Sequence, residues 1–422
     1  MKNLEYVLSG TSYVRLASTN ICEDPKLVAV INDMLDKILG GKNGKYTHDI
    51  SILFNAFGEK AFGQRLQVYK DHIKNLHADS GGLQIITLGK TITPELKEEV
   101  YEVQANGSDV GMCFDEIPVT LTGLRSERNS TTDRIFDREN FEDYARKTGQ
   151  NIKKQIEIFK KEESDCRPFL ILQGNDVDTY LKWYEYVMDE IPKEDQHRVG
   201  GIALGAAALG TGPLEDVQRA FIASQIPWHS EKMHLHILGV GSIRRLIPYL
   251  IFQQSGLYKN IEISYDSTSH SRAVETGAFF LNQNVIKYGR EYSDIYRILF
   301  EEVMSHYDMG TSKDVFYDAL NLATKDWLEK YDTLEYWVIC RMATIFASIA
   351  NFMKYLETMI HSKDNILKYS EKIKLGTQYR ALYAVNNRSD FDLWYNDQYL
   401  GREIKSTPIL DTAPNTLEDL FV

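Results

Sequence analysis

The sequence predicts an α/β fold, a (β/α)8 TIM-type barrel followed by a helical C-terminal region. Eight short β-rich segments recur along the chain up to residue 267, and helical spacing fills the stretches between them. Strands that alternate with helices imply parallel pairing through right-handed crossovers, and eight such repeats favour closure into a barrel. An open doubly wound sheet is the alternative. No GxGxxG motif follows the first predicted strand, which argues against the dinucleotide-binding version of such a sheet.

The segments predicted as strands contain runs of apolar residues, as expected for strands that are covered on both faces. In chain order they are EYVLSG from Glu5, DISILFNAF from Asp49, NLHAD from Asn75, VGMCFDE from Val110, PFLILQG from Pro168, GGIALG from Gly200, HLHILGVG from His234 and IEISYDS from Ile261.

Helical spacing is clearest between these strands, over residues 94–107, 140–161 and 177–191. The third of these helices has Asp176 or Asp178 as its expected N-terminal cap. The pattern changes after residue 310, because residues 315–360 predict long helices without a strand signal. We therefore divide the chain into a catalytic barrel domain, residues 1–310, and a helical region, residues 311–422, which is a candidate nucleic-acid-binding or oligomerisation element.

The length of 422 residues and the hydrophobic fraction of 43% fit one barrel domain with a smaller appendage. No run approaches the roughly 18 apolar residues of a membrane helix, and the N-terminus lacks the apolar core of a secretory signal. The expected location is therefore the cytoplasm. The four cysteines include no CxxC pair, which favours reduced residues over a disulfide framework or a cysteine-rich zinc site.

The net charge of −12 is unfavourable for phosphate contacts, although only the local potential at a binding face matters. Basic side chains concentrate between Leu124 and Lys161, mixed with acidic ones. That segment fits a salt-bridged, solvated helix as well as a phosphate-facing edge. His234 and His236 share one face of a predicted strand, and a packed strand explains them better than a metal site does.

Polar residues and glycines follow the carboxyl ends of six predicted strands, where the active sites of such barrels lie. A single Asp after a strand is usually a helix cap, but six polar or glycine-rich ends in register are hard to explain by capping alone. Glycines there let a flat ligand approach the backbone. Five of these follow a predicted strand, namely Asp79-Ser80-Gly81-Gly82, Asp115-Glu116, Gln173-Gly174, Gly239-Val240-Gly241 and Asp266-Ser267, and the sixth, Gly200-Gly201, sits at strand six.

Together these ends resemble the tRNA-guanine transglycosylase family, including the relatives that place 7-deazaguanines in DNA. The resemblance covers about residues 75–280 in the family's order. It rests on DSGGLQ at 79–84, FDE at 114–116, LQG at 172–174, GGIALG at 200–205, ILGVG at 237–241 and YDSTSHSRAVETG at 265–277.

The resemblance implies a role for each matching residue. Asp266 matches the nucleophile that attacks C1′ of the target nucleoside and expels guanine, and Asp79 matches the general acid/base. Base exchange with retention requires two inversions, and hence a carboxylate that forms a covalent glycosyl intermediate. The positions implied to hydrogen-bond the base are Ser80, Asp115, Gln173 and Gly201, those that sandwich it are Leu83 and Leu238, and Arg272 is implied to contact phosphate.

The chain departs from the tRNA enzymes in three ways. It has no cysteine between Cys166 and Cys340, so their zinc motif is absent, and we expect no metal and no other cofactor. Ala206 stands where bacterial enzymes carry a glutamate that accepts a cationic base, which favours a neutral substituent such as the nitrile of 7-cyano-7-deazaguanine (preQ0). No RNA-binding domain of the archaeal type follows the barrel.

These departures favour a DNA-guanine transglycosylase, of the kind a phage encodes for use in the host cytoplasm. Its expected partners are DNA and a 7-deazaguanine base such as preQ0. The alternatives are the same chemistry on tRNA, a non-catalytic partner subunit of such an enzyme, and an unrelated barrel hydrolase. A non-catalytic subunit would be expected to lose the catalytic residues, so the presence of both Asp79 and Asp266 argues against that alternative. Whether the protein acts alone, as a homodimer or with an accessory subunit stays open.

Overall fold

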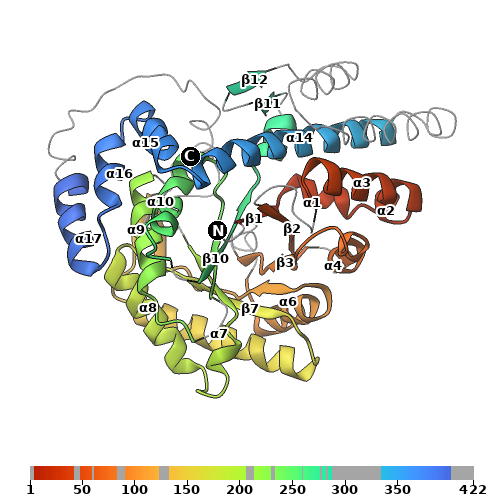
Figure 1. Ribbon diagram of the computed structural model, residues 1–422. Helices are drawn as coiled ribbons and strands as arrows, with labels where there is room; N and C mark the ends of the chain where they lie inside the picture. Colours follow the sequence, from red (N-terminus) through yellow and green to blue (C-terminus); the bar gives the residue numbers. More distant parts are fainter. Residues whose placement is uncertain are drawn as a thin grey trace. The chain divides into compact units, whose positions relative to one another are not determined.

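A computed structural model describes residues 4–41, 48–58, 61–82, 91–122, 133–205, 213–229, 233–258, 260–275, 278–281, 284–287 and 334–400. It contains a closed barrel in the order β1-β10-β9-β8-β7-β4-β3-β2, with parallel neighbours such as β1–β2 and β7–β8 (Figure 1). Every strand predicted from the sequence is a barrel strand, so the barrel is confirmed and the open sheet is wrong. The strands are β1 (Leu4–Leu8), β2 (His48–Asn55), β3 (Leu76–Asp79), β4 (Val110–Met112), β7 (Arg167–Leu172), β8 (Gly201–Leu204), β9 (Met233–Ile237) and β10 (Ile261–Ser267).

Helices connect these strands as the alternating pattern predicts. The predicted helices at 94–107 and 177–191 appear as α6 and α8, and Asp176 caps α8 by accepting a hydrogen bond from the Thr179 N–H at 2.8 Å. The helices of this part of the chain are α1 (Thr11–Leu16), α2 (Thr19–Cys22), α3 (Pro25–Ile38), α4 (Ala61–Leu66), α6 (Pro94–Gly107), α7 (Phe141–Lys161), α8 (Val177–Glu190), α9 (Pro213–Gln225), α10 (Ile243–Gln254) and α11 (Ser269–Glu275).

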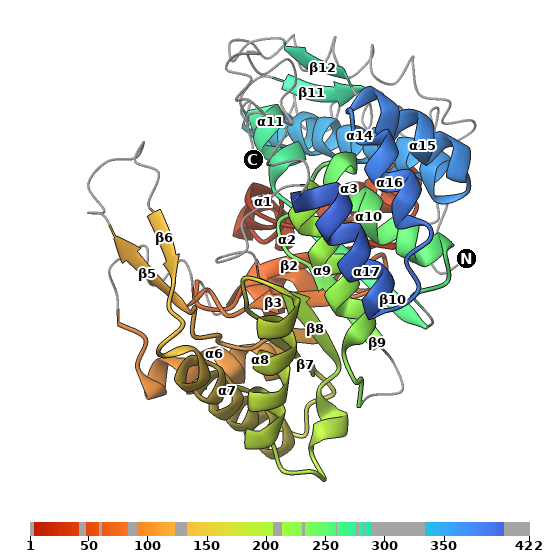
Figure 2. The same ribbon diagram turned by 90° about the vertical axis from the view of Figure 1, so that its left-hand side faces the viewer.

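Two antiparallel hairpins were not predicted from the sequence (Figure 2). One pairs β5 (Val119–Thr122) with β6 (Asp133–Phe136), and the other pairs β11 (Ala278–Leu281) with β12 (Asn284–Lys287). Each strand has four residues. That length carries only two alternations of a strand pattern, too few to distinguish it from a loop.

The C-terminal region is helical wherever the structure describes it, as predicted. Phe391 of α17 stacks on Phe221 of α9 with ring centroids 4.0 Å apart. The Gln254 side chain of α10 donates hydrogen bonds to the carbonyls of Met359 and Ile360 at 3.0 and 2.8 Å. The helices are α14 (Leu334–Ile360), α15 (Lys363–Lys372), α16 (Gly376–Leu382) and α17 (Arg388–Trp394), followed by a π-helical turn (Tyr395–Leu400).

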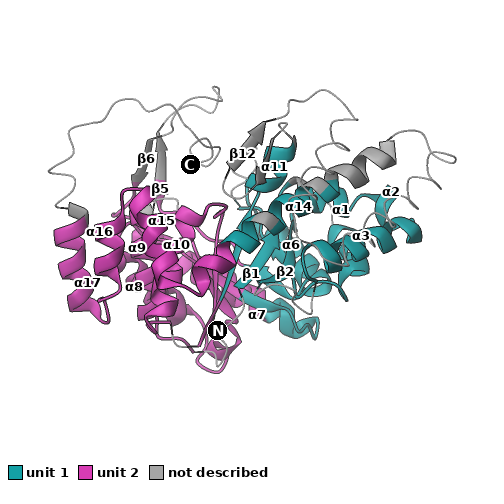
Figure 3. Cartoon of the chain, turned by 45° about the horizontal axis from the view of Figure 1, so that its top comes forward, with its two compact units in different colours: residues 1–112, 157–168, 263–355 teal, residues 113–156, 169–262, 356–422 magenta. Residues whose placement is uncertain are grey.

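The chain forms two compact units, each assembled from segments that are distant in sequence (Figure 3). Unit 1 comprises residues 1–112, 157–168 and 263–355, and unit 2 comprises residues 113–156, 169–262 and 356–422. The sequence-based division at residue 310 separates the barrel from the helical C-terminal region. Each of the two compact units instead combines barrel strands with C-terminal helices.

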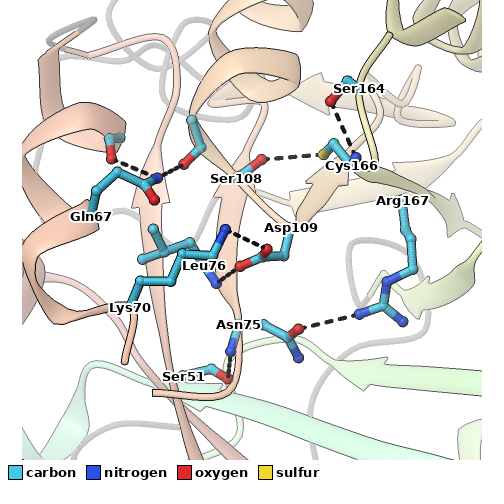
Figure 4. Close-up of polar contacts among 12 residues, drawn as sticks. Ser51, Gln67, Lys70, Asn75, Leu76, Ser108, Asp109, Ser164, Cys166 and Arg167 are labelled. Carbon is cyan, nitrogen blue, oxygen red and sulfur yellow. Dashed lines mark hydrogen bonds and ion pairs between the residues drawn. The ribbon is translucent and has the colours of Figure 1, made fainter. Parts of the chain in front are cut away.

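Polar contacts in unit 1 anchor the amino ends of β3 and β4 (Figure 4). The Asp109 carboxylate accepts a hydrogen bond from the Leu76 N–H at 2.8 Å and lies 3.2 Å from the Lys70 ammonium. Nearby, the Arg167 guanidinium contacts the Asn75 side-chain oxygen at 3.5 Å. In TIM-type barrels this end contributes to stability, and active sites lie at the opposite, carboxyl end of the strands.

Two further findings bear on the sequence-based expectations. Within the described ranges, no helix is both long and apolar enough to span a membrane. Cys22 and Cys166 are free thiols, as expected from their spacing.

Candidate functional site

Asp79 is the last residue of β3 and is followed by a turn that depends on glycine. Asp79 is paired with Asn55 at the end of β2, and its carbonyl accepts a hydrogen bond from the Ala56 N–H at 2.9 Å. Gly81 has φ of 74°, and a Cβ there would lie 2.5 Å from the Asn55 side-chain oxygen. Only glycine fits this backbone, so part of the DSGG signature is explained by turn geometry. Ser80 is buried within the turn.

Asp266 lies near the carboxyl end of β10 and is 7% exposed. Its neighbour Tyr265 packs edge-on against Tyr6 of β1 at 5.3 Å, and both rings contact Phe352 of α14. Since side chains alternate along a strand, Asp266 points to the opposite face, the barrel interior. Burial raises the pKa of the Tyr6 phenol well above its usual value, and the Asp266 charge contributes to that shift.

The strand register places the two carboxylates at nearly the same level. Asp266 is paired with Val7, Val7 with Ser51, and Ile52 with Leu76. Asp79 therefore lies four residues beyond the position level with Asp266, across three strand-to-strand steps. The strands of a TIM-type barrel are tilted with a shear of 8, so the residue at a given height lies about one residue further along each successive strand. Over three strands this accounts for about three of the four residues. Asp79 and Asp266, both in unit 1, thus lie at nearly the same height, each at the carboxyl end of its own strand.

A layer of buried polar groups lies beneath Asp79 inside unit 1. The Glu5 carboxylate is 1% exposed and lies 2.7 Å from His77 Nε2, and it accepts hydrogen bonds from Ser51 and, at 3.0 Å, from the Asn75 amide. His77 precedes Asp79 by two residues and so shares its face of β3. The sequence analysis missed this layer. Its only sequence signal was a glutamate in an otherwise apolar strand.

Tyr13 is a second residue that the sequence analysis missed. It is half-buried on α1, with its ring 5.6 Å from that of Phe62, and partial burial raises the pKa of its phenol, with a contribution from the Asp79 charge. The turn before α1 is tight, because Gly10 has φ of 66° and a Cβ there would lie 2.7 Å from the Thr268 methyl group. The first βα loop therefore contacts the segment that follows Asp266 and brings a phenol close to Asp79.

Unit 2 contains a hydrogen-bonded pair of predicted base-binding residues. The Gln173 amide donates to the Asp115 carboxylate at 2.7 Å, and Gln173 is 3% exposed. The buried Oε1 of Gln173 has no hydrogen-bond partner within the described residues. A Cβ at Gly205 would lie 2.3 Å from the Gln173 amide nitrogen. Glycine at 205 therefore leaves room for the Gln173 side chain, and the Gln173 Oε1 atom could accept a hydrogen bond from a ligand.

Gly201, another predicted base-binding position, has a packing role. A Cβ there would lie 2.5 Å from the Phe169 ring and 2.7 Å from the His234 carbonyl oxygen. Its missing side chain is therefore required inside the barrel wall. Gly201 is also the first residue of β8, so the expectation that it lies at the carboxyl end of its strand, with the other predicted site residues, is wrong. Leu238 is half-buried after β9, and Arg272 is exposed on α11. Leu83 and Ala206 lie outside the described residues.

The structure shows what His234 and the described part of the basic segment contact. His234 packs against Phe169 at 4.9 Å, as a packed strand requires, and no metal-holding group of three or more His, Cys, Asp or Glu residues occurs in the described parts of the chain. On α7, Arg146 pairs with Glu142 and Glu190 at 2.8 and 3.0 Å, which fits the salt-bridged helix. Residues 123–132 of the basic segment lie outside the described ranges.

Comparison with known proteins adds no assignment. No protein-family model matches this chain, and no curated protein sequence matches it significantly. The functional interpretation therefore depends on the residues and their geometry.

Proposed function

We propose that the protein is a DNA-guanine transglycosylase, a pentosyltransferase that exchanges guanine in DNA for preQ0 or a related 7-deazaguanine. The observation that carries the proposal is the placement of Asp79 and Asp266 at one level, at the carboxyl ends of β3 and β10. Retaining exchange at a sugar carbon needs one carboxylate as nucleophile and a second group to move protons.

In the proposed reaction, an Asp266 oxygen attacks C1′ as the glycosidic bond to guanine breaks. Asp79 supplies the proton that the departing base takes up. The incoming base then loses a proton to Asp79 and attacks C1′, which breaks the Asp266–sugar bond. One glycosidic bond replaces another, so the reaction needs no oxidant, nucleotide or external energy source.

The Asp115–Gln173 pair supports recognition of a guanine-type base. The N1–H and N2–H groups of guanine require acceptors, which the Asp115 carboxylate and the unpartnered Gln173 Oε1 supply. Because Gln173 is buried and its orientation is set by Asp115 and Gly205, its acceptor is oriented before a base binds. Such preorganisation favours a ligand that carries donors over one that lacks them.

The choice of DNA over tRNA rests on the sequence departures described above. The missing cysteines remove the zinc subdomain of the tRNA enzymes, and Ala206 favours a neutral base such as preQ0. A stacked base must leave the duplex to reach a carboxylate inside a barrel, so we propose that the target nucleotide is flipped. Arg272, exposed on α11 close to Asp266 in sequence, is proposed as a phosphate contact.

The test is incorporation of labelled guanine or preQ0 into duplex DNA or tRNA by the full chain, combined with Asp266→Asn. We expect label in DNA alone. The variant should lose the denaturation-resistant protein–DNA adduct and at least about 1000-fold of the rate, because the amide is a poor nucleophile. Asp178→Asn, which changes an exposed carboxylate on α8, is the matched control and should leave the rate unchanged.

The outcomes separate the alternatives. Labelling of tRNA alone would overturn the DNA assignment and retain the chemistry. A fully active Asp266→Asn variant would overturn the nucleophile. No labelling of either polymer with any guanine-type base would remove the transglycosylase proposal.

A further inference from the structure

Unit 2 contains a buried charged cluster that the proposed reaction does not use. Asp216, in the first turn of α9, is fully buried and binds two guanidinium groups. The Arg219 guanidinium lies 2.8 Å from one carboxylate oxygen and the Arg245 guanidinium 2.7 Å from the other. The Tyr249 hydroxyl contacts the same carboxylate at 3.4 Å.

This Asp216 cluster is connected to the loops that follow β8 and β9. Arg245 also donates a hydrogen bond to the Gly239 carbonyl at 2.9 Å. On the other side, the Tyr180 hydroxyl donates to the Gly205 carbonyl, and the Arg219 charge acts on that same phenol. Two carbonyls in two separate loops are thus held by side chains that converge on one carboxylate.

Both loops belong to the proposed base-recognition region of unit 2. Gly205 lies against the Gln173 amide, so the position of its backbone determines where that side chain can lie. Gly239 follows Leu238, has φ of 63°, and would have no neighbour within 4 Å of an added Cβ. The bond from Arg245 therefore acts on a glycine with a left-handed backbone, directly after Leu238.

A purely stabilising role explains this arrangement poorly. Burying a carboxylate with two guanidinium groups carries a large desolvation cost, and well-packed apolar residues are often as stable. What such a cluster provides is fixed geometry, because several hydrogen bonds to one buried carboxylate hold its partners in a narrow range of arrangements. The cluster joins side chains of α8, α9 and α10, and two of its bonds end on the backbone carbonyls of Gly205 and Gly239, which is the placement expected of a group that positions those segments.

We infer that Asp216 is a positioning residue that, through Arg245 and the Arg219–Tyr180 pair, fixes the Gly239 and Gly205 backbones and thereby orients Gln173 and Leu238 for a guanine-type base. The identity of that ligand rests on the proposed function. Asp216 itself touches neither the base nor the reacting atoms in this assignment.

The experiment uses variants that keep the buried carboxylate paired. Tyr180→Phe removes only the hydroxyl that binds Gly205, and Arg245→Met removes the bond to Gly239 while Arg219 still pairs with Asp216. Tyr184→Phe is the matched control, because its hydroxyl bonds to the Pro227 carbonyl from the same helix α8. Arg245→Lys keeps a positive charge on a long side chain, and so tests whether a charged donor at this position restores the contact with the Gly239 carbonyl that Arg245→Met removes.

Two readouts are measured on the full chain. Steady-state exchange should show KM for guanine about tenfold higher in Tyr180→Phe and Arg245→Met, with kcat changed less than threefold. Hydrogen exchange should be at least tenfold faster at the Gly205 amide in Tyr180→Phe, because the bond from that amide to the Leu172 carbonyl loses its support. Tyr184→Phe should match the wild type in both readouts, and Arg245→Lys should recover part of the affinity.

Each outcome decides one claim. Unchanged hydrogen exchange at Gly205 in Tyr180→Phe overturns the positioning role, whether or not the protein exchanges bases. Faster hydrogen exchange with an unchanged KM overturns the link from these loops to base recognition. A wild-type protein without base exchange overturns the proposed function, while the hydrogen-exchange comparison still tests how the cluster holds its loops.

Discussion

The glycines at the start of β8 and directly after it serve different physical purposes, although their sequence contexts look alike. Gly201 is surrounded by a ring and a backbone carbonyl, while the nearest neighbours of Gly205 are the terminal atoms of the Gln173 side chain. Aromatic packing and backbone inside a barrel wall move little, whereas the end of a glutamine can rotate. Substitution should therefore separate stability from ligand binding.

We predict that Gly201→Ala destabilises the protein by about 2–4 kcal/mol, because overpacking against Phe169 and the His234 carbonyl forces strand displacement. Gly205→Ala should cost less than about 1 kcal/mol but raise KM for the base at least about tenfold, because the methyl group displaces the Gln173 amide. Urea unfolding and exchange kinetics on the two variants check this pair. Equal loss of stability in both would contradict the distinction.

At the scale of elements, the C-terminal helices behave as part of their units and not as a separate appendage. Within unit 1, the Phe352 ring of α14 lies 4.7 Å from the His270 ring of α11. Within unit 2, α17 contacts α9 through a parallel ring stack, and Arg388 forms an ion pair with Asp178 of α8 at 3.0 Å. The apolar contacts carry most of this attachment, because exposed ion pairs contribute little.

The two faces of α17 provide a test. Phe391 is 2% exposed and stacks on Phe221, while Leu393 on the same helix is 62% exposed. Phe391→Ala should lower the free energy of unfolding by about 3–5 kcal/mol, and Leu393→Ala should change it by less than about 0.5 kcal/mol. Thermal or urea denaturation measures both. A similar small effect at both positions would mean that α17 is not held by its aromatic face.

At the scale of the whole molecule, two buried histidines make stability depend on pH. Burial lowers the pKa of His48 and of His270 from 6.5 to about 3 in the folded protein. Both imidazoles are therefore neutral when folded, whereas the unfolded chain takes up protons as pH falls through 6.5. The unfolded state binds more protons over this range, so stability is complete above pH 6.5 and decreases as pH falls toward 3.

Each histidine should cost about 2 kcal/mol of stability by pH 5, since each pH unit below the unfolded pKa is worth about 1.4 kcal/mol. His48 has no hydrogen-bond partner for either ring nitrogen within the described residues, so His48→Leu removes a proton-binding group without breaking a bond. Urea unfolding at pH 7.5 and pH 5 should show a smaller loss in this variant. The exposed His197→Leu is the control, and an unchanged loss in His48→Leu would contradict the assignment.

Much of this architecture could be predicted from the sequence. Apolar runs bounded by glycine and aspartate located every barrel strand, and helical spacing with an Asp cap located α8, because these patterns are written in neighbouring residues. The same local reading located Asp79, Asp115, Gln173 and Asp266 at strand ends. The short hairpins and the polar layer around Glu5 were missed, since four-residue strands and one acidic residue carry too little local pattern.

The order and type of the barrel elements and the residue types at the strand ends were therefore determined by the sequence alone. Only the tertiary structure decided that Asp79 and Asp266 lie at nearly one level and that Gly201 serves packing. It also decided that Asp216 is connected to Gly239 through Arg245, and to Gly205 through Arg219 and Tyr180. The physical reason is that strand register and side-chain convergence depend on segments far apart in the chain. Neither the strand register nor the convergence of side chains can be predicted from the pattern of neighbouring residues.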